Sequence, residues 1–373
     1  MPSKPDGPDR LANPDAAEPP GPAARLEPSR EDVEDARPQP LDDDDRAPEA
    51  LRDLVRRRSA ARARRHWATA DALRAEIEAA GWKPLDRGTH TSLRRAVAPD
   101  RIADGLVRYG TSAAVPSRLA DPPTAAWTVA IAAGSDPEAL ARLLAGLRRH
   151  APAGTQVVVA ADDPSREMDE RLRPGAPDLA PIAGLALEVV RTSVPIGAAG
   201  ARNAALRRAV GELVVLADPS VRPTGDAFAP LAAALADPAV ALAGPFGLAS
   251  TDLRHFAPAA GPEAVAIEGC WLAFRRSDYA GLGPLDERFL EAAYLDAWWS
   301  AVLRVGATGT GPEPPPLRRS VVVPLPLERD PGPGVTLAAQ AARSARRQFY
   351  RLLDRLRDRP DLAVTPATGS TPP

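Results

Sequence analysis

Carboxylates directly follow two apolar stretches of this chain. Asp218 comes after the continuous apolar run 213–217, and Asp162 and Asp163 come after residues 156–161. Such runs are typical of buried parallel strands, and the ligands of an open α/β sheet gather at the carboxyl ends of its strands. We therefore expect Asp218 to lie at a binding site. Asp162 and Asp163 could serve such a site too, or could cap the helix that follows them.

The elements that would position Asp218 precede it in the chain. Residues 188–190 form a short apolar strand, Gly197 lies in a glycine-rich loop, and residues 201–210 have helix-forming composition with arginines on one side. Gly211 is expected to end that helix. The order strand, loop, helix, strand predicts a βαβ unit of a parallel sheet.

The same stretch, residues 189–220, resembles a segment of the family 2 glycosyltransferases, enzymes whose α/β fold binds nucleotide sugars. The residues that match the family's pattern in order and spacing are Gly197, Ala201, Arg202, Asn203, Gly211, Glu212 and Asp218. Pro195 and Ser220 replace an Asn and the second Asp of the family's D-x-D motif. The alternative interpretation is an ordinary βαβ unit with an arginine-rich helix face.

Two later segments carry the resemblance most specifically, because both their order and their spacing match. Residues 265–279 resemble the family's G-x-x-(M/L)-A-F-(R/K)-R segment, and residues 283–289 resemble (V/L)-G-x-F-D-E-x-F. The resemblance implies an α/β fold of the glycosyltransferase A-type, in which a mostly parallel sheet is flanked by helices. Leu295 and Asp296 align with the family's acidic pair, and the family's metal-binding His has no counterpart at residues 328–330.

The resemblance also implies a donor-binding site. Asp162, Asp163 and Ser165 match the family's D-D-G-S motif, whose acidic residue holds the nucleoside of the donor. A carboxylate suits that task because it can accept a hydrogen bond from the N–H of uracil or guanine. The other donor-site residues implied by the resemblance are Gly197, Arg202, Asn203 and Asp218.

The chemistry implied by the resemblance is inverting sugar transfer from a nucleoside diphosphate sugar. In this family Mg²⁺ or Mn²⁺ on the D-x-D carboxylates stabilises the leaving diphosphate, which makes Asp218 the metal ligand, and one carboxylate can suffice when water and phosphates complete the coordination. Asp296 is the implied general base for the acceptor hydroxyl. Trp298 and Trp299 could stack on a sugar ring of the acceptor, or could pack in the core on one face of a helix.

Residues 47–95 form a separate arginine-rich module, either one long helix or a helical hairpin. Residues 47–92 resemble the C-terminal helical module of cysteinyl-tRNA synthetases, and the matching residues are Arg64, Trp67, Ala70, Asp71, Leu73, Arg74, Ile77, Gly81, Asp86, Gly88 and Thr89. The single Cys and the lack of an H-I-G-H-like motif exclude synthetase activity. The arginines could bind RNA phosphates while Trp67 or Trp82 stacks on a base, or they could be a solvated face.

Composition limits the remaining functional classes. The 373 residues carry a net charge of −2, which gives no whole-chain case for nucleic-acid or membrane binding. Four scattered His and one Cys exclude a disulfide framework and a cysteine zinc site. No apolar run reaches the ~18 residues that a membrane-spanning helix needs, and the start lacks the apolar core of a signal peptide. We expect a cytoplasmic protein.

The domain organisation follows from these segments, beginning with an acidic, Pro-rich tail that we expect to be disordered. The predicted parts are the tail 1–46, the helical module 47–95, a linker 96–124, a glycosyltransferase-like domain 125–330, a C-terminal helix 331–359 and a disordered tail 360–373. Two functions stay open. One is an inverting glycosyltransferase with an unknown acceptor, favoured by Asp162, Asp218 and Asp296. The other is a catalytically degenerate relative that binds a nucleotide or a partner such as RNA, favoured by the departures from the family's motifs.

Overall fold

The structure is a computed structural model, which describes residues 47–87, 90–162, 164–176, 186–259, 261–306, 316–331, 334–342, 345–357 and 359–363. The chain divides into two compact units, Met1–Arg94 and Arg95–Pro373. The predicted tail 1–46 and residues 364–373 lie outside the described residues.

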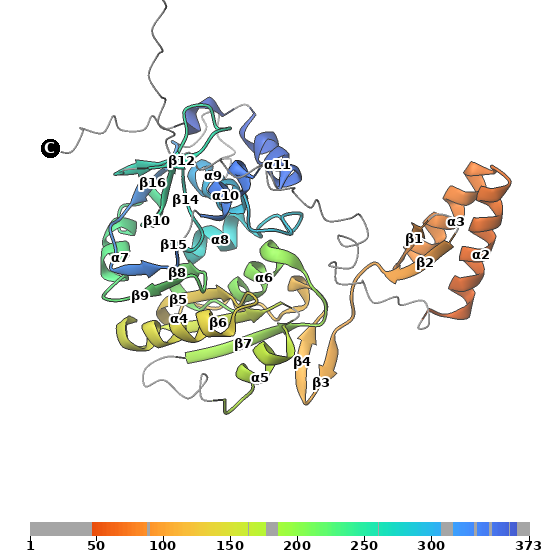
Figure 1. Ribbon diagram of the computed structural model, residues 1–373, viewed down its shortest axis with the longest axis horizontal. Coiled ribbons are helices and arrows are strands. Elements are labelled where there is room, and N and C mark those ends of the chain that lie inside the picture. The colour runs from red at the N-terminus through yellow and green to blue at the C-terminus, as the bar shows by residue number, and fades with distance from the viewer. Residues whose placement is uncertain are drawn as a thin grey trace, which may run out of the picture. The chain divides into compact units, whose positions relative to one another are not determined.

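The first unit is a helical hairpin packed on a two-stranded sheet (Figure 1). Its elements are α2 (Glu49–Ala63), α3 (Trp67–Ala79), β1 (Trp82–Arg87) and β2 (His90–Arg95). Leu51, Ile77 and Trp82 are buried together in its core, whereas Trp67 is 59% exposed. Of the two predicted arrangements the hairpin is the correct one, and the resemblance of this unit to the synthetase module stays a prediction.

A carboxylate beside the hairpin binds a buried arginine in this first unit. Arg58 is only 5% exposed and donates two hydrogen bonds to Asp86, at 2.8 and 2.9 Å. Arg62 and Thr91 also donate to Asp86. These donors, Arg58 above all, hold the pKa of Asp86 well below its usual value.

We expect acid to remove the contribution of Asp86 to the stability of this unit. A carboxyl group whose folded pKa is lowered contributes stability above its unfolded pKa of ~4, and that stability is lost as pH falls towards the folded value. In Asp86→Asn the contribution is missing already at neutral pH, so α2 and α3 should exchange amide hydrogens faster than in the wild type. When amide exchange is measured on the full chain, the difference in rate between Asp86→Asn and the wild type should shrink as the pH falls towards about 2. Equal exchange at neutral pH would contradict the role of Asp86.

The second unit is built on one ten-stranded sheet with the order β13-β16-β10-β15-β8-β5-β6-β7-β4-β3. In chain order these strands are β3 (Arg101–Ala103), β4 (Leu106–Tyr109), β5 (Ala125–Ala132), β6 (Gln156–Ala161), β7 (Ala186–Thr192), β8 (Gly211–Ala217), β10 (Val240–Gly244), β13 (Glu263–Ala264), β15 (Trp271–Arg275) and β16 (Arg319–Val322). Five of the nine neighbouring pairs are parallel, including the central run β7-β6-β5-β8. The strand order reverses at β5, which has β6 on one side and β8 on the other. Such a switch point is where open α/β sheets bind ligands.

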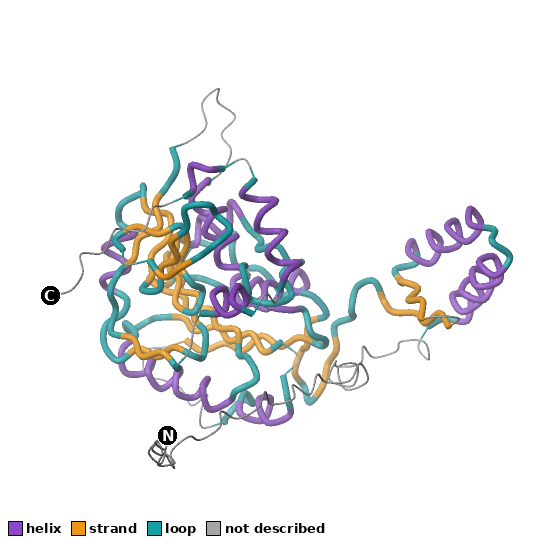
Figure 2. Tube along the Cα trace, turned by 45° about the horizontal axis from the view of Figure 1, so that its top comes forward, coloured by secondary structure: helices purple, strands orange, loops and turns teal. Residues whose placement is uncertain are grey.

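Helices cover both faces of this sheet (Figure 2). One face carries α6 (Gly197–Leu206), α8 (Arg276–Leu282), α9 (Leu295–Val305), α10 (Val335–Ala341) and α11 (Arg346–Leu356), and the other carries α4 (Pro137–His150), α5 (Arg166–Arg171) and α7 (Ala229–Leu235). Alternate residues of a strand point to opposite faces. In β8, Val214 therefore packs on the first face and Val215 on the second. The predicted α/β class, a large sheet flanked by helices, is confirmed.

Short strands outside this sheet complete the second unit. β9 (Val221–Pro223) pairs with β17 (Leu327–Arg329), and β11 (Gly247–Ala249) pairs with both β12 (Ala257–Pro258) and β14 (Ala266–Ile267). The pairing of β9 with β17 brings residues 327–330 next to the turn that follows β8. Within the described ranges, no helix combines the length and the hydrophobicity that a membrane span requires.

Four expectations about the arrangement of the elements are corrected. The predicted linker 96–124 contains β3 and β4, which join the main sheet, and the predicted helix 331–359 is divided into α10 and α11. The predicted tail 360–373 begins with an ordered turn in which Leu362 is buried. Gly211 does not end α6 but begins β8, where a Cβ atom would lie 2.3 Å from the backbone nitrogen of Thr128.

Candidate functional site

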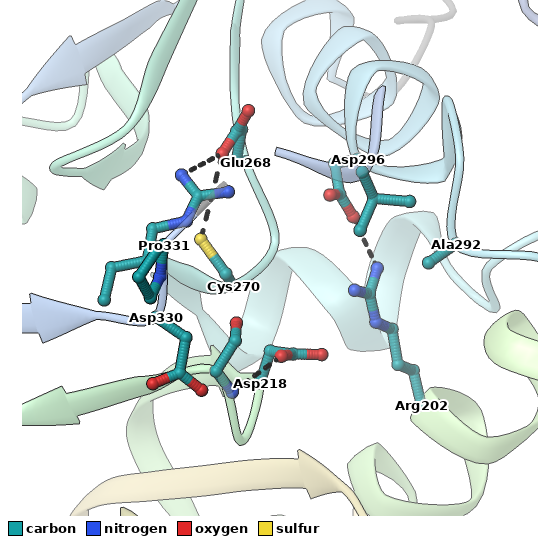
Figure 3. Close-up of a pocket in the computed structure, with 11 residues that line it drawn as sticks. Arg202, Asp218, Glu268, Cys270, Ala292, Asp296, Asp330 and Pro331 are labelled. Atoms are coloured by element: carbon teal, nitrogen blue, oxygen red, sulfur yellow. Dashed lines mark hydrogen bonds and ion pairs between the residues drawn. The ribbon is translucent and has the colours of Figure 1, made fainter. Parts of the chain in front are cut away.

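A cavity of about 230 Å³ lies at the carboxyl end of β8 (Figure 3). Its lining is mostly charged or polar and comprises Arg202, Asp218, Ser220, Glu268, Cys270, Asp296, Arg329 and Asp330, with Ala292, Pro331 and Val335 as the apolar part. Three of the predicted site residues, Arg202, Asp218 and Asp296, therefore meet in one cavity although they come from separate segments of the chain.

Asp218 stands where the sequence predicts it, directly after the last residue of β8. Its backbone N–H donates to the carbonyl oxygen of Cys270 at 3.0 Å, which follows from the antiparallel pairing of β8 with β15. Its Oδ1 accepts a hydrogen bond from the backbone of Ser220 at 2.9 Å. One carboxylate oxygen thus holds the turn after β8, and the half-buried side chain lines the cavity.

Arg202 of α6 and Asp296 of α9 form a buried ion pair in the cavity. Nη1 of Arg202 donates to Oδ1 of Asp296 at 2.5 Å, and the backbone N–H of Gly269 donates to Oδ2 at 2.7 Å. Arg202 is 8% exposed and Asp296 is 6% exposed. Burial acts to lower the pKa of Arg202, but Asp296 and then Asp218 raise it above its usual value. The guanidinium therefore stays charged in the cavity.

Glu268 and Arg329 form a second ion pair that the sequence reasoning missed. Nη1 of Arg329 donates to Oε2 of Glu268 at 2.7 Å, and the Arg329 guanidinium lies over the ring of Phe246 at 4.7 Å. Burial raises the pKa of Glu268, although Arg329 opposes this effect. The sequence did contain a signal for Glu268, which is an acidic residue inside the apolar stretch 265–274. An acid that is buried there needs a partner or a function.

A glycine lies against the carboxylate of each pair. A Cβ atom on Gly269 would lie 2.3 Å from Oδ1 of Asp296, and one on Gly334 would lie 1.7 Å from Oε1 of Glu268. No larger side chain fits at either position without moving the carboxylate. The neighbouring Cys270 thiol is no nucleophile in this setting, because burial raises its pKa and keeps it protonated.

The carboxylate of Asp162 holds the glycine-rich loop at the start of α6. Its Oδ1 accepts from Thr192 Oγ1 at 2.8 Å and from the backbone of Ile196 at 2.9 Å, and its Oδ2 accepts from the backbone of Gly197 at 2.9 Å. Gly197 has φ +81°, and a Cβ atom there would lie 2.9 Å from the Cα of Leu290. Both residues are structural parts of the loop, and a contact with a nucleoside stays a prediction for them.

The remaining residues of the predicted D-D-G-S match do not line the cavity. Asp163 lies outside the described residues. Ser165 is the N-cap of α5, where its side chain accepts a hydrogen bond from the backbone of Met168 at 3.2 Å. Ser165 and not Asp162 caps α5, so the helix-cap alternative is wrong for Asp162.

Asn203 is corrected from a donor-binding residue to a structural one. Its amide nitrogen donates to Leu285 O and to Glu287 Oε1, both at 2.9 Å, and its amide oxygen accepts from Tyr279 Oη at 2.9 Å and from Leu285 N at 3.0 Å. Asn203 is 1% exposed, so both donors and both acceptor positions of its amide are used inside the protein.

Loss of Asn203 should therefore reduce stability rather than donor binding. In Asn203→Ala several buried polar groups lose their partner, and each such group costs about 1–3 kcal/mol, so we expect the free energy of unfolding to fall by about 3 kcal/mol. Denaturant unfolding measures this change. Tyr279→Phe removes one of the four hydrogen bonds and should cost about 1 kcal/mol. Unchanged stability together with lost nucleotide binding would restore the donor-binding role.

The two predicted acceptor residues are mainly packing residues. Trp299 is fully buried, with edge contacts to Phe274 and Tyr279, so it cannot reach an acceptor. Trp298 is half-buried and packs on Phe289 and Trp299. Neither lines the cavity, and the core-packing alternative is the correct one for Trp299 because α9 presents this side chain to the sheet. For Trp298, acceptor binding stays a prediction.

No family model matches the chain, and no curated protein matches it either. The chain is similar to solved structures that include the mannosyltransferase PcManGT from Pyrobaculum calidifontis in complex with GDP-Man and Mn²⁺ (22% identity, TM-score 0.40, 65% of this chain and 71% of that chain). Two others are GalNAc-T7 with UDP, GalNAc and Mn²⁺ (13%, 0.44, 65% and 49%) and S. aureus TarS 1-349 (13%, 0.42, 61% and 63%). The chain thus spans about half the length of GalNAc-T7. Since these TM-scores all lie below 0.5, we rest the function on the cavity itself.

Proposed function

We propose that the second unit transfers a sugar from a nucleoside diphosphate donor to an acceptor hydroxyl, with a divalent cation at Asp218. The observation that supports this most is the meeting of Arg202, Asp218 and Asp296 in one cavity. Arg202 and Asp218 belong to one segment that resembles glycosyltransferases, residues 189–220, and Asp296 belongs to a second one. The cavity also lies beside the point where the strand order reverses, which is the expected ligand site of an open α/β sheet.

The charges of the cavity favour a cation at one end. The two charges cancel within each buried ion pair. The cavity then has two further carboxylates, Asp218 and Asp330. The backbone N–H of Asp330 donates to the carbonyl oxygen of Ser220 at 2.8 Å, which keeps Asp330 beside the Asp218 turn. The partner of Asp330 is the exposed Arg142, at 3.5 Å. Two nearby carboxylates with little compensation repel a diphosphate and attract a divalent cation.

The donor set fits Mg²⁺ or Mn²⁺ by chemistry, because both ions prefer oxygen ligands. Among the described residues, no group of three or more His, Cys, Asp or Glu side chains could hold a metal ion. Asp218 and Asp330 would therefore need phosphate oxygens and water to complete the coordination, as Mg²⁺ sites often do. Such a cation would neutralise charge on the leaving diphosphate. It follows that the cation and the donor bind together.

The residues of the chain divide the remaining work. The acceptor oxygen attacks the sugar carbon, the bond to the diphosphate breaks, and a single displacement inverts that carbon. Arg202 stays charged and can stabilise the phosphates as they leave. A carboxylate of the cavity must take the proton of the hydroxyl, and the resemblance assigns this step to Asp296.

Thermal stabilisation by a panel of nucleoside diphosphates and their sugars, each with and without Mn²⁺, tests this function. Binding to the folded protein raises its apparent stability by mass action. We expect one base to stabilise the protein and Mn²⁺ to enlarge the effect. No shift with any nucleotide would sink the proposal, and binding without turnover would support the degenerate alternative.

A further inference from the structure

We propose that Thr336 is a positioning residue for Asp296, which it holds in place through the backbone of Tyr294. This inference rests on the sugar transfer proposed above, in which Asp296 takes the proton of the acceptor hydroxyl. The observation that points to it is a backbone conformation. Tyr294 lies two residues before Asp296 and has φ +62°, in the left-handed region.

The left-handed conformation of Tyr294 needs support from its surroundings. In this region the Cβ atom of an L-residue comes close to the following carbonyl oxygen, so a bulky residue is a genuine outlier there. Residues held in such conformations persist only where their surroundings fix them, and they cluster at active sites. Tyr294 is the N-cap of α9, so its conformation sets the direction in which that helix begins.

Two contacts from the C-terminal helices hold Tyr294. Its backbone N–H donates to Oγ1 of Thr336 in α10 at 3.1 Å, and the centroid of its ring lies 5.3 Å from that of Phe349 in α11. Both helices lie beside α9 (Figure 1). Thr336 is 1% exposed and Tyr294 is 3% exposed, so water cannot take the place of the hydroxyl. Loss of Oγ1 would leave a buried N–H without its partner, which favours a different backbone conformation.

The start of α9 carries Asp296 into the cavity, because Asp296 is the second residue of that helix. Its Oδ1 accepts from Arg202 at 2.5 Å, and its Oδ2 accepts from the backbone of Gly269 at 2.7 Å. A carboxylate has about four lone-pair sites, so each oxygen can still accept the proton of a hydroxyl. Arg202 and Gly269 thus hold the carboxylate end of Asp296, and Thr336 holds the helix end.

The first turn of α10 also belongs to the wall of the cavity. Val335 lines the cavity, and a Cβ atom on Gly334 would lie 1.7 Å from Oε1 of Glu268. Three consecutive residues of the chain therefore lie against Glu268, the cavity and Tyr294. This arrangement fits a segment that shapes the site. The alternative is that Thr336 contributes to stability alone, and the experiment has to separate the two.

The test compares Thr336→Val with Thr336→Ser in the full chain. Valine has the shape of threonine without the oxygen, whereas serine keeps the hydroxyl. The substrate is the nucleoside diphosphate sugar that stabilises the protein most, and the readout is release of the nucleoside diphosphate with water as acceptor. We expect Thr336→Val to lower kcat by about 10²-fold, which misplacement of an active-site group by about 1 Å can cost. The donor KM should change less, because Asp218 and Asp330 are untouched. Thr336→Ser should keep most of the wild-type kcat.

Thr155→Val is the matched control for a loss of stability. Thr155 is 1% exposed, and its Oγ1 donates to the carbonyl oxygen of Pro152 at 2.7 Å. It lies directly before β6, at the amino end of the parallel strands, whereas the cavity lies at the carboxyl end. The control should lose stability in denaturant unfolding, as Thr336→Val does, and should keep the wild-type kcat.

Three results overturn the proposal: wild-type kcat in Thr336→Val, an equal loss of kcat in Thr155→Val, or a Thr336→Ser variant as slow as Thr336→Val. If Asp218→Ala still abolishes turnover in such a case, the transferase function stands without the positioning role. If the wild type releases no nucleotide from any donor, both proposals fail.

Phe349→Leu provides the same test through the second contact if Thr336→Val does not fold. Phe349 is half-buried and packs on the ring of Tyr294, so this variant weakens the support of Tyr294 while the hydrogen bond to Thr336 remains. We expect kcat to fall again with a smaller change in the donor KM. A wild-type kcat in Phe349→Leu would then overturn the proposal.

Discussion

Asp218→Ala should lose the part of nucleotide binding that depends on Mn²⁺, and its turnover should fall by about 10²–10⁴-fold. A catalytic cation contributes several kcal/mol to stabilising charge in the transition state, and each 1.36 kcal/mol changes the rate tenfold. Asp218 is one of two cavity carboxylates outside the buried ion pairs, so its removal leaves Asp330 alone at the cation end. Thermal stabilisation by nucleotide with and without Mn²⁺ measures the binding, and nucleotide release measures the turnover.

Asp354→Ala is the matched control. Asp354 is an exposed residue of α11, its partner Arg357 is also exposed, and pairs of this kind contribute little to stability. The control should keep both the Mn²⁺ dependence and the turnover. A cation role for Asp218 is excluded if Asp218→Ala binds nucleotide as strongly as the wild type and still responds to Mn²⁺.

The central strands were predictable because a strand that is buried on both faces appears in the sequence as a continuous apolar run. β6 and β8 are nearly continuous apolar runs, and each was expected within two residues of its observed bounds. The edge strands β3 and β4 were read as a linker. They have three and four residues, and their facing residues Ile102 and Val107 are 78% and 44% exposed, so no periodic pattern marks them. Their place in the sheet depends on pairing with β7, which is a contact distant in sequence.

The site was predictable only in part, for a similar reason. Arg202, Asp218 and Asp296 were found because recognisable motifs carry them. Residue type alone could not tell that the amide of Asn203 is saturated inside the protein, since its partners lie about 80 residues away in the chain. Glu268 and Arg329 were missed because their pairing links the loop before β15 to the end of β17, 61 residues away in the chain. The charge balance of the cavity is a property of the folded chain that no single segment contains.

Gly269→Ala should damage both the stability of the protein and its activity. The new Cβ atom would lie 2.3 Å from Oδ1 of Asp296 and 2.9 Å from Nη2 of Arg202, so the buried ion pair cannot keep its geometry. Breaking a buried pair costs about 3–5 kcal/mol, and misplacement of an active-site group by about 1 Å can cost 100-fold in rate. We expect Gly269→Ala to show both the loss of stability, in denaturant unfolding, and the loss of rate, in nucleotide release.

A second glycine supplies the control for this substitution. Gly281 lies in α8 and a Cβ atom there would meet nothing within 4 Å, so Gly281→Ala should be neutral or should stabilise by up to ~1 kcal/mol through its better helix propensity. The cause of the Gly269 effect can then be isolated with Asp296→Ala. If the collision with Asp296 is responsible, Gly269→Ala should add little damage once that carboxylate has been removed. Fully additive losses would mean that Gly269 acts through its own backbone, and Asp296 would no longer be the reason that this position must be glycine.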